Sequence, residues 1–200
     1  GIETALPGNF NLTNAVAAAT LGHALVITYE TILSGIKKCT VVPGRMEFVA
    51  IPGKTLPFSI VVDYAHTPDS LKAVYSTFPD KRLLCVLGGT GGGRDTWKRP
   101  LMGEIADTHC SKIFLTDEDP YDEDPRAIVA DVRRGIKKNT PVVQMDRRLA
   151  IRAAVGEAAN GDMIIITGKG TDPYIMGPRG TKIPWSDMHI AEEEATVRAS

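Results

Sequence analysis

The fold of this chain is decided by a nonapeptide that joins an apolar strand to a helix, Val61-Val62-Asp63-Tyr64-Ala65-His66-Thr67-Pro68-Asp69. The apolar run from Phe58 to Val62 predicts a buried strand. Pro68 then opens a helix, with Thr67 as its N-cap and Asp69 in its first turn. The polar side chains between them lie at the carboxyl end of a strand, where open α/β sheets bind ligands. Taken alone, the stretch is equally consistent with a capped turn that binds nothing.

A glycine-rich segment follows the next apolar strand, Leu83 to Leu87, and runs from Gly88 to Asp95. Glycines let the backbone approach an anion closely, and N–H groups at a helix start attract negative charge. Basic side chains suited to carboxylate or phosphate stand in and after the segment, at Arg94, Lys98 and Arg99. The segment matches neither the dinucleotide fingerprint nor the P-loop. The basic residues favour a ligand-binding loop over a plain turn.

Six segments resemble, in order, motifs of the Mur ligase family, and specifically its MurE type, the UDP-N-acetylmuramoyl-tripeptide synthetases. The likeness covers nearly the whole chain, and six motifs in order are far more specific than any one of them. Cyanophycin synthetases and folylpolyglutamate synthetases share the Asp-Tyr-Ala-His type of motif, but they fit the Lys-Arg-Pro and Asp-Pro segments less well. The matching segments are Gly8 to Ala15, Gly44 to Glu47, Asp63 to Asp69, Gly92 to Pro100, Thr116 to Pro125 and Gly168 to Gly170.

Composition limits the classes of partner. The chain has 200 residues, 43% of them hydrophobic, and a net charge of −1, which suits one domain or one domain with part of another. Neither nucleic acid nor a membrane is expected as a partner, because charge is balanced and no run approaches membrane-spanning length. The three cysteines, Cys39, Cys85 and Cys110, have no metal-site spacing. With no signal peptide visible, we interpret them as reduced thiols of a cytoplasmic protein.

Apolar strands alternate with amphipathic helices beyond Arg45, which predicts an α/β, Rossmann-like, mostly parallel sheet with helices on both faces. Two helices precede it, Leu12 to Ala24 and Thr28 to Lys37, and Val42-Pro43-Gly44 ends them. Strands are expected near 46–51, 58–63, 82–88, 112–117, 141–146 and 162–167. Helices are expected near 68–77, 99–109, 125–138 and 147–159, the last with Asp146 as N-cap.

The resemblance implies two parts: residues 1–44 as the end of the central ATP-binding domain, and residues 45–200 as the carboxy-terminal domain that receives the incoming amino acid. The family forms an amide between UDP-N-acetylmuramoyl-dipeptide and an amino acid in peptidoglycan synthesis, using ATP and Mg²⁺. Its P-loop and main Mg²⁺ ligands belong to the upstream part of the family sequence, so this chain alone is expected to be inactive. The implied partners are small-molecule substrates.

Four residues match family positions at the nucleotide. Asn14 is expected at adenine or ribose, Asp63 at ribose, and Arg45 at phosphate or ribose, while His66 would line the adenine pocket. Three of them also have a structural alternative. Asn14 is a helix-start residue, Arg45 suits a surface ion pair with Glu47, and His66 suits a bond to neighbouring backbone.

Five residues match the family's amino-acid pocket. Arg94 corresponds to the arginine that binds the incoming carboxylate, and Gly168 and Asp172 to the end of the pocket. Asp119 and Tyr121 fall on the second and fourth positions of the family's Asp-Asn-Pro-Arg motif. None of these residues resembles a covalent nucleophile, and no catalytic or metal-ligating residue is assigned.

Tyr121 stands where diaminopimelate-adding members have an arginine. Tyrosine cannot form a bidentate ion pair, and the acids beside it, Glu118 and Asp119, favour an ammonium over a carboxylate. This charge pattern favours L-lysine as the added amino acid, unless Arg126 or Arg179 replaces the missing cation. Two other functions stay open: another Mur or folylpolyglutamate-type amide ligase, and a non-catalytic module that binds a nucleotide or an amino acid.

Overall fold

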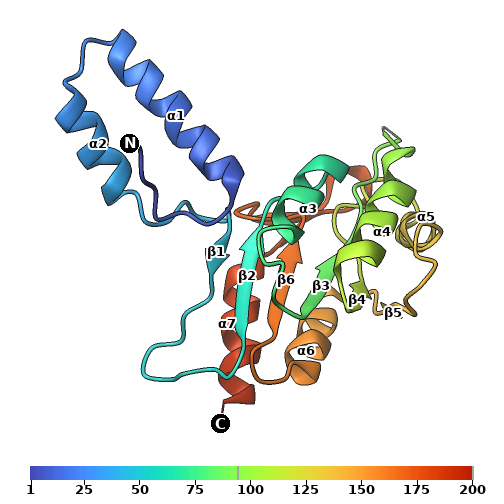
Figure 1. Ribbon diagram of the computed structural model, residues 1–200. Coiled ribbons are helices and arrows are strands. Elements are labelled where there is room, and N and C mark those ends of the chain that lie inside the picture. The colour runs from blue at the N-terminus through green and yellow to red at the C-terminus, as the bar shows by residue number, and fades with distance from the viewer. Residues whose placement is uncertain (94, 200) are drawn as a thin grey trace.

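A mostly parallel sheet forms the centre of the computed structural model, which describes residues 1–93 and 95–199 (Figure 1). The strand order is β1-β2-β6-β3-β4-β5, and each neighbouring pair is parallel except β1 with β2. The predicted Rossmann-like fold class is confirmed. The strands of this sheet are β1 (Glu47–Phe48), β2 (Ser59–Asp63), β3 (Leu83–Leu87), β4 (Lys112–Leu115), β5 (Val142–Val143) and β6 (Met163–Thr167).

Helices cover both faces of the sheet (Figure 1). Side chains alternate between the faces along each strand, so Val61 and Cys85 enter one core while Val62 and Leu84 enter the other. Burial on both faces explains why these strands are apolar throughout. One core includes α3 (Pro68–Tyr75), α4 (Lys98–His109) and α5 (Pro125–Arg133), and the other includes α6 (Arg147–Glu157) and α7 (Asp187–Arg198).

The two predicted caps, Thr67 and Asp146, are present, together with a third at Asp124. Thr67 Oγ1 accepts a hydrogen bond from the Ser70 N–H, and Ser70 Oγ accepts one from the Thr67 N–H, forming a capping box. Asp124 caps α5, and Asp146 caps α6 by accepting from the Leu149 N–H. These caps fix where each strand-to-helix connection turns.

The first two helices form a separate pair, α1 (Asn9–Ala24) and α2 (Tyr29–Lys38), which projects from the sheet beside β1 (Figure 1). Both helices were predicted. The boundary proposed at residue 44 between two domains stays a prediction.

Several elements differ from the prediction. α5 ends at Arg133 and not at 138, and Gly135, just beyond its end, packs so closely on α4 that a Cβ there would lie 1.8 Å from the Pro100 carbonyl oxygen. β1 and β5 are only two residues long. An antiparallel hairpin, β7 (Tyr174–Met176) with β8 (Lys182–Pro184), and the helix α7 were missed. A short 3₁₀ turn, η1 (Pro178–Gly180), lies between the hairpin strands.

The interpretation of all three cysteines as reduced thiols is wrong for two of them. Cys85 on β3 and Cys110 at the end of α4 form a disulfide, with their Cα atoms 6.1 Å apart. The partners are separated by 25 residues, and only the return of α4 along β3 brings them together. Cys39 is a free, exposed thiol. Within the described part of the chain, no helix is long and apolar enough to cross a membrane.

Candidate functional site

A cavity of about 710 Å³ lies where the α1–α2 pair meets the carboxyl end of β2 and the start of α3. All four residues predicted at the nucleotide line it: Asn14, Arg45, Asp63 and His66. Most of the cavity wall is apolar, and these polar groups interrupt it. This combination suits a flat heterocycle with a polar substituent. The four assignments remain predictions, but their side chains do share one cavity.

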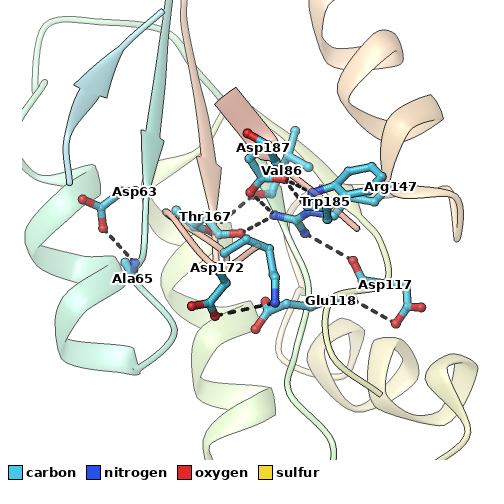
Figure 2. Close-up of polar contacts among 12 residues, drawn as sticks. Asp63, Ala65, Val86, Asp117, Glu118, Arg147, Thr167, Asp172, Trp185 and Asp187 are labelled. Atoms are coloured by element: carbon cyan, nitrogen blue, oxygen red, sulfur yellow. Dashed lines mark hydrogen bonds and ion pairs between the residues drawn. The ribbon is translucent and has the colours of Figure 1, made fainter. Parts of the chain in front are cut away.

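Asp63 is held by the backbone. Its Oδ2 accepts from the Met46 N–H and its Oδ1 from the Ala65 N–H, both at 2.7 Å; Figure 2 shows the bond to Ala65. Burial raises the pKa of Asp63, and the two backbone hydrogen bonds partly offset that rise. The carboxylate therefore organises the turn, and its remaining lone pairs can still accept from a hydroxyl in the cavity.

Arg45 and His66 line the same cavity, and both contact Tyr64. The Arg45 guanidinium lies 4.3 Å above the Tyr64 ring, while Glu47 accepts from the Gly44 N–H. The alternative of an Arg45–Glu47 surface pair is therefore not the arrangement observed. His66 bonds the Tyr64 carbonyl through Nδ1, as its structural alternative expected, and its ring still lines the cavity. Asn14 donates to the Asn11 side chain within α1.

A second cluster forms where β6, β3 and β4 end side by side. The loop after β3 lies on the loop after β4, because the Gly91 N–H donates to the Asp119 carbonyl at 2.7 Å. Thr90 adds a hydrogen bond from its Oγ1 to Glu118 Oε1 at 2.9 Å. The glycine-rich loop and the acidic segment thus share one edge of the sheet, as parallel strand ends require. Arg94 itself lies outside the described residues.

Lys169, after β6, completes the cluster. Its Nζ lies 2.7 Å from both Oδ1 and Oδ2 of Asp119, and both residues are buried. Asp119 also accepts from the Met176 N–H. The sequence argument treated Asp119 as an acceptor available to a substrate ammonium, whereas this carboxylate is already neutralised. Asp172 lies 3.6 Å from the same ammonium, and its side chain is 41% exposed.

Glu118 is the site residue whose environment the sequence did not reveal. Its side chain is buried between Gly88 and Gly168, either of which would press a Cβ to within 3 Å of it. Burial raises the pKa of Glu118, while the charge of Arg147 and the bond from Thr90 oppose the rise. The sequence signal that could have revealed this environment is the pair of glycines that follow the ends of β3 and β6, because a glycine there often marks a place where another group approaches the backbone closely.

Tyr121 lies beside a second cavity, of about 530 Å³, between the acidic segment and the β7–β8 hairpin. Its backbone has φ 51°, and its N–H donates to the Met176 carbonyl. Arg179 lies close by, since its N–H donates to Asp122 Oδ1 at 2.7 Å. The missed hairpin therefore brings one of the two candidate replacement cations to the acidic segment. Arg126 is exposed at the first turn of α5.

The first cavity fits the base and ribose of ATP in the character of its lining. Arg45 lines it with a guanidinium group that suits a phosphate. For Mg²⁺ the residues fit less well. In residues 1–93 and 95–199, no group of three or more His, Cys, Asp or Glu side chains is placed to hold a metal ion.

Comparison with known proteins gives a consistent result. The family model described as Mur ligase, glutamate ligase domain, matches residues 44–170. Ligases named UDP-N-acetylmuramoyl-L-alanyl-D-glutamate–2,6-diaminopimelate ligase are 42% identical in Synechococcus elongatus and 40% identical in Geobacillus kaustophilus, over 98% and 100% of this chain. These matches cover 39% and 40% of the relatives, so this chain spans about two fifths of their length.

Solved structures agree. One titled as the structure of a UDP-N-acetylmuramoyl-L-alanyl-D-glutamate–2,6-diaminopimelate ligase has 31% identity and a TM-score of 0.72, covering 98% of this chain and 40% of that one. A folylpolyglutamate synthase of Mycobacterium tuberculosis has a TM-score of 0.61 at 19% identity, over 84% of this chain and 39% of its own. The second likeness shows a shared fold alone.

Proposed function

This chain belongs to the Mur ligase family, as its carboxy-terminal glutamate ligase domain, and from that premise we propose that it is the acceptor-binding part of an ATP-dependent amide ligase of peptidoglycan synthesis. The single observation that carries the proposal is the identity of about 40% to muramoyl-dipeptide ligases across essentially the whole chain. We further propose that residues 1–44 are the end of the central domain. We also propose a cytoplasmic location, because the proposed reaction uses ATP and UDP-linked substrates.

The chain's own residues bind and orient in this proposal. The carboxyl end of β2 holds one side of the nucleotide through Asn14, Arg45, Asp63 and His66. The neighbouring ends of β6, β3 and β4 hold the amino acid. The amine of that amino acid attacks an acyl phosphate made from the muramoyl-peptide carboxylate and ATP, the new C–N bond forms, and inorganic phosphate leaves. Placing both reactants on one sheet edge supplies the proximity that such a step needs.

We propose 2,6-diaminopimelate as the added amino acid, the substrate in the relatives' names. The sequence-based preference for L-lysine is not supported by those names. It also loses force because Lys169 already neutralises Asp119. A distal carboxylate therefore meets less negative charge than the acidic segment alone implies. We propose Arg179 as the residue that binds it, because its backbone N–H donates to Asp122, a residue that lines the second cavity.

The test uses the full-length protein with UDP-N-acetylmuramoyl-L-alanyl-D-glutamate and ATP. We expect phosphate release that depends on the amino acid, with a tripeptide product identified by its mass. Lysine, ornithine and meso-diaminopimelate are assayed in parallel, and diaminopimelate is expected to have the highest kcat/KM. A tenfold preference for lysine would restore the charge argument from the sequence. Phosphate release that ignores the amino acid would overturn the ligase assignment.

A further inference from the structure

Arg147, the first residue of α6, is buried beneath the cluster of strand ends, with 1% of its side chain exposed. Its guanidinium donates to two backbone carbonyls, from Nη1 to Asp117 at 3.2 Å and from Nη2 to Thr167 at 2.8 Å. The same group pairs with both carboxylate oxygens of Asp187 at 2.8 and 2.7 Å. Figure 2 shows these four contacts converging on one side chain.

Each of the two carbonyls that Arg147 contacts belongs to the residue just before a site segment. Asp117 directly precedes Glu118, and Thr167 directly precedes Gly168. These loops follow β4 and β6, which are not neighbours in the sheet, because β3 lies between them. The ladders through β3 set the spacing of the two strand ends, but no ladder hydrogen bond joins the two loops directly beyond those ends. Arg147 contacts both of them from one rigid, planar group.

Asp187 fixes the orientation of that group. It lies at the start of α7, is fully buried, and accepts a further hydrogen bond from Trp185 Nε1 at 2.8 Å. A bidentate carboxylate determines the plane of a guanidinium, so the remaining N–H groups are aimed at the carbonyls of Asp117 and Thr167.

From this geometry we propose that Arg147 is a positioning residue of the amino-acid site. It sets the distance between the Glu118–Asp119 segment and the Gly168–Asp172 segment, and so lets Lys169 reach Asp119. The inference rests on the proposed function for its kinetic consequence. Its structural part, the coupling of two loops through one side chain, is independent of that function.

A second arginine on the same helix provides a matched control. Arg152 pairs with Glu194 of α7 through Nε and Nη2, and so joins α6 to α7 without contacting either loop. If Arg147 only holds the two helices together, the Arg147 and Arg152 variants should differ from each other in stability but not in their binding of the amino acid. If Arg147 positions the loops, only its replacement changes the binding of the amino acid.

The experiment compares Arg147→Lys with Arg152→Lys in the full-length enzyme. Lysine keeps the charge and can pair with Asp187, but one ammonium cannot also reach both carbonyls. We expect Arg147→Lys to raise KM for the amino acid at least tenfold and to leave KM for ATP within twofold. Arg152→Lys should leave both within twofold. Equal KM changes in the two variants, or no change in either, would overturn the proposal.

Hydrogen exchange separates this inference from the proposed function. The N–H groups of Glu118 and Asp172 are hydrogen-bonded within the two loops, and the N–H of Tyr121 ties the first loop to Met176 of β7. Arg147→Lys should speed their exchange, whereas Arg152→Lys should not. If exchange is faster in Arg147→Lys but the wild-type enzyme has no ligase activity, the positioning role is supported and the proposed function is rejected. Unchanged exchange would reject the positioning role. Should Arg147→Lys fail to fold, Asp187→Asn, which loosens the guanidinium while keeping Arg147, carries the same test with the same expected direction.

Discussion

Lys169 and Asp119 form a buried ion pair in which one ammonium nitrogen lies 2.7 Å from both carboxylate oxygens. The partners come from loops after β6 and β4, 50 residues apart. Pairing makes the acidic segment of this chain less negative than its sequence suggests. It also makes both residues hard to replace, because each leaves a buried charge when the other is removed.

Removal of Lys169 is expected to destabilise the chain. Lys169→Met should lower the free energy of unfolding by about 3–5 kcal/mol, because Asp119 is left buried without its cation. Lys112→Met is the control, since the Lys112–Glu157 pair is partly exposed and should contribute less than about 1 kcal/mol. Urea unfolding of both variants measures the difference. Equal losses would mean that the buried pair contributes no more than a surface pair.

Two glycines at positive φ allow the cost of an unfavourable backbone conformation to be separated from the effect of a steric clash with Glu118. Gly168 has φ 110°, and a Cβ there would lie 2.2 Å from Glu118 Oε2. Gly161 has φ 84° and open space around the same position. Both alanine variants should lose about 1–2 kcal/mol from the backbone conformation.

Only Gly168→Ala should also displace Glu118, and we expect it to lower kcat/KM for the amino acid in the full-length enzyme by tenfold or more. Activity of Gly161→Ala should stay within twofold of wild type. Comparable activity in both variants would show that the position of Glu118 is unimportant for the reaction.

Arg94 is predicted, from its place in the family motif, to bind the α-carboxylate of the incoming amino acid. Arg94→Ala should raise KM for the amino acid by roughly 10²-fold, the effect of losing a charge-assisted pair of a few kcal/mol, while KM for ATP changes little. Arg133→Ala, at an exposed position on α5, is the control. If KM for ATP rises and KM for the amino acid holds, Arg94 belongs to the nucleotide site.

Asp107 is predicted to make stability depend on pH in the acid range. Desolvation raises its pKa, but hydrogen bonds from Lys137, Lys138 and Asn139 outweigh this and lower the pKa to about 2. A folded pKa below the unfolded value of 3.8 stabilises the fold above about pH 4, and this stabilisation is lost as pH falls toward 2.

Asp107→Asn should therefore be less stable than wild type near pH 6, with a gap that narrows between pH 4 and 2. Urea unfolding at several pH values measures the gap, with exposed Asp80→Asn as control. If the difference in the free energy of unfolding between wild type and Asp107→Asn stays constant down to pH 2, the loss of stability comes from altered packing and not from the charge of Asp107.

Counting reactive thiols tests the Cys85–Cys110 disulfide. Such bonds are rare in cytoplasmic proteins, so a cytoplasmic location does not explain this one. Unfolded without reductant, the chain should present one reactive thiol, Cys39, and after reduction three. Three thiols before reduction would restore the interpretation drawn from the sequence.

The sequence alone predicted most helices and strands and two helix caps, because periodicity and capping depend on residues close together in the chain. The caps Thr67 and Asp146 could be assigned this way. Motif order also indicated the family. The hairpin β7–β8 and α7 were missed because their short or mixed patterns carry weak periodicity.

Only the tertiary structure decided which charges neutralise one another. The pairing of Lys169 with Asp119 and the contacts of Arg147 with Asp117, Thr167 and Asp187 join residues 20 to 50 positions apart. These contacts exist because β6 inserts between β2 and β3, which brings the ends of β6 and β4 to the two sides of β3. Strand order is set by how all the layers pack, so no local pattern reveals it. For that reason the acidic segment could be located from the sequence, but its effective charge could not.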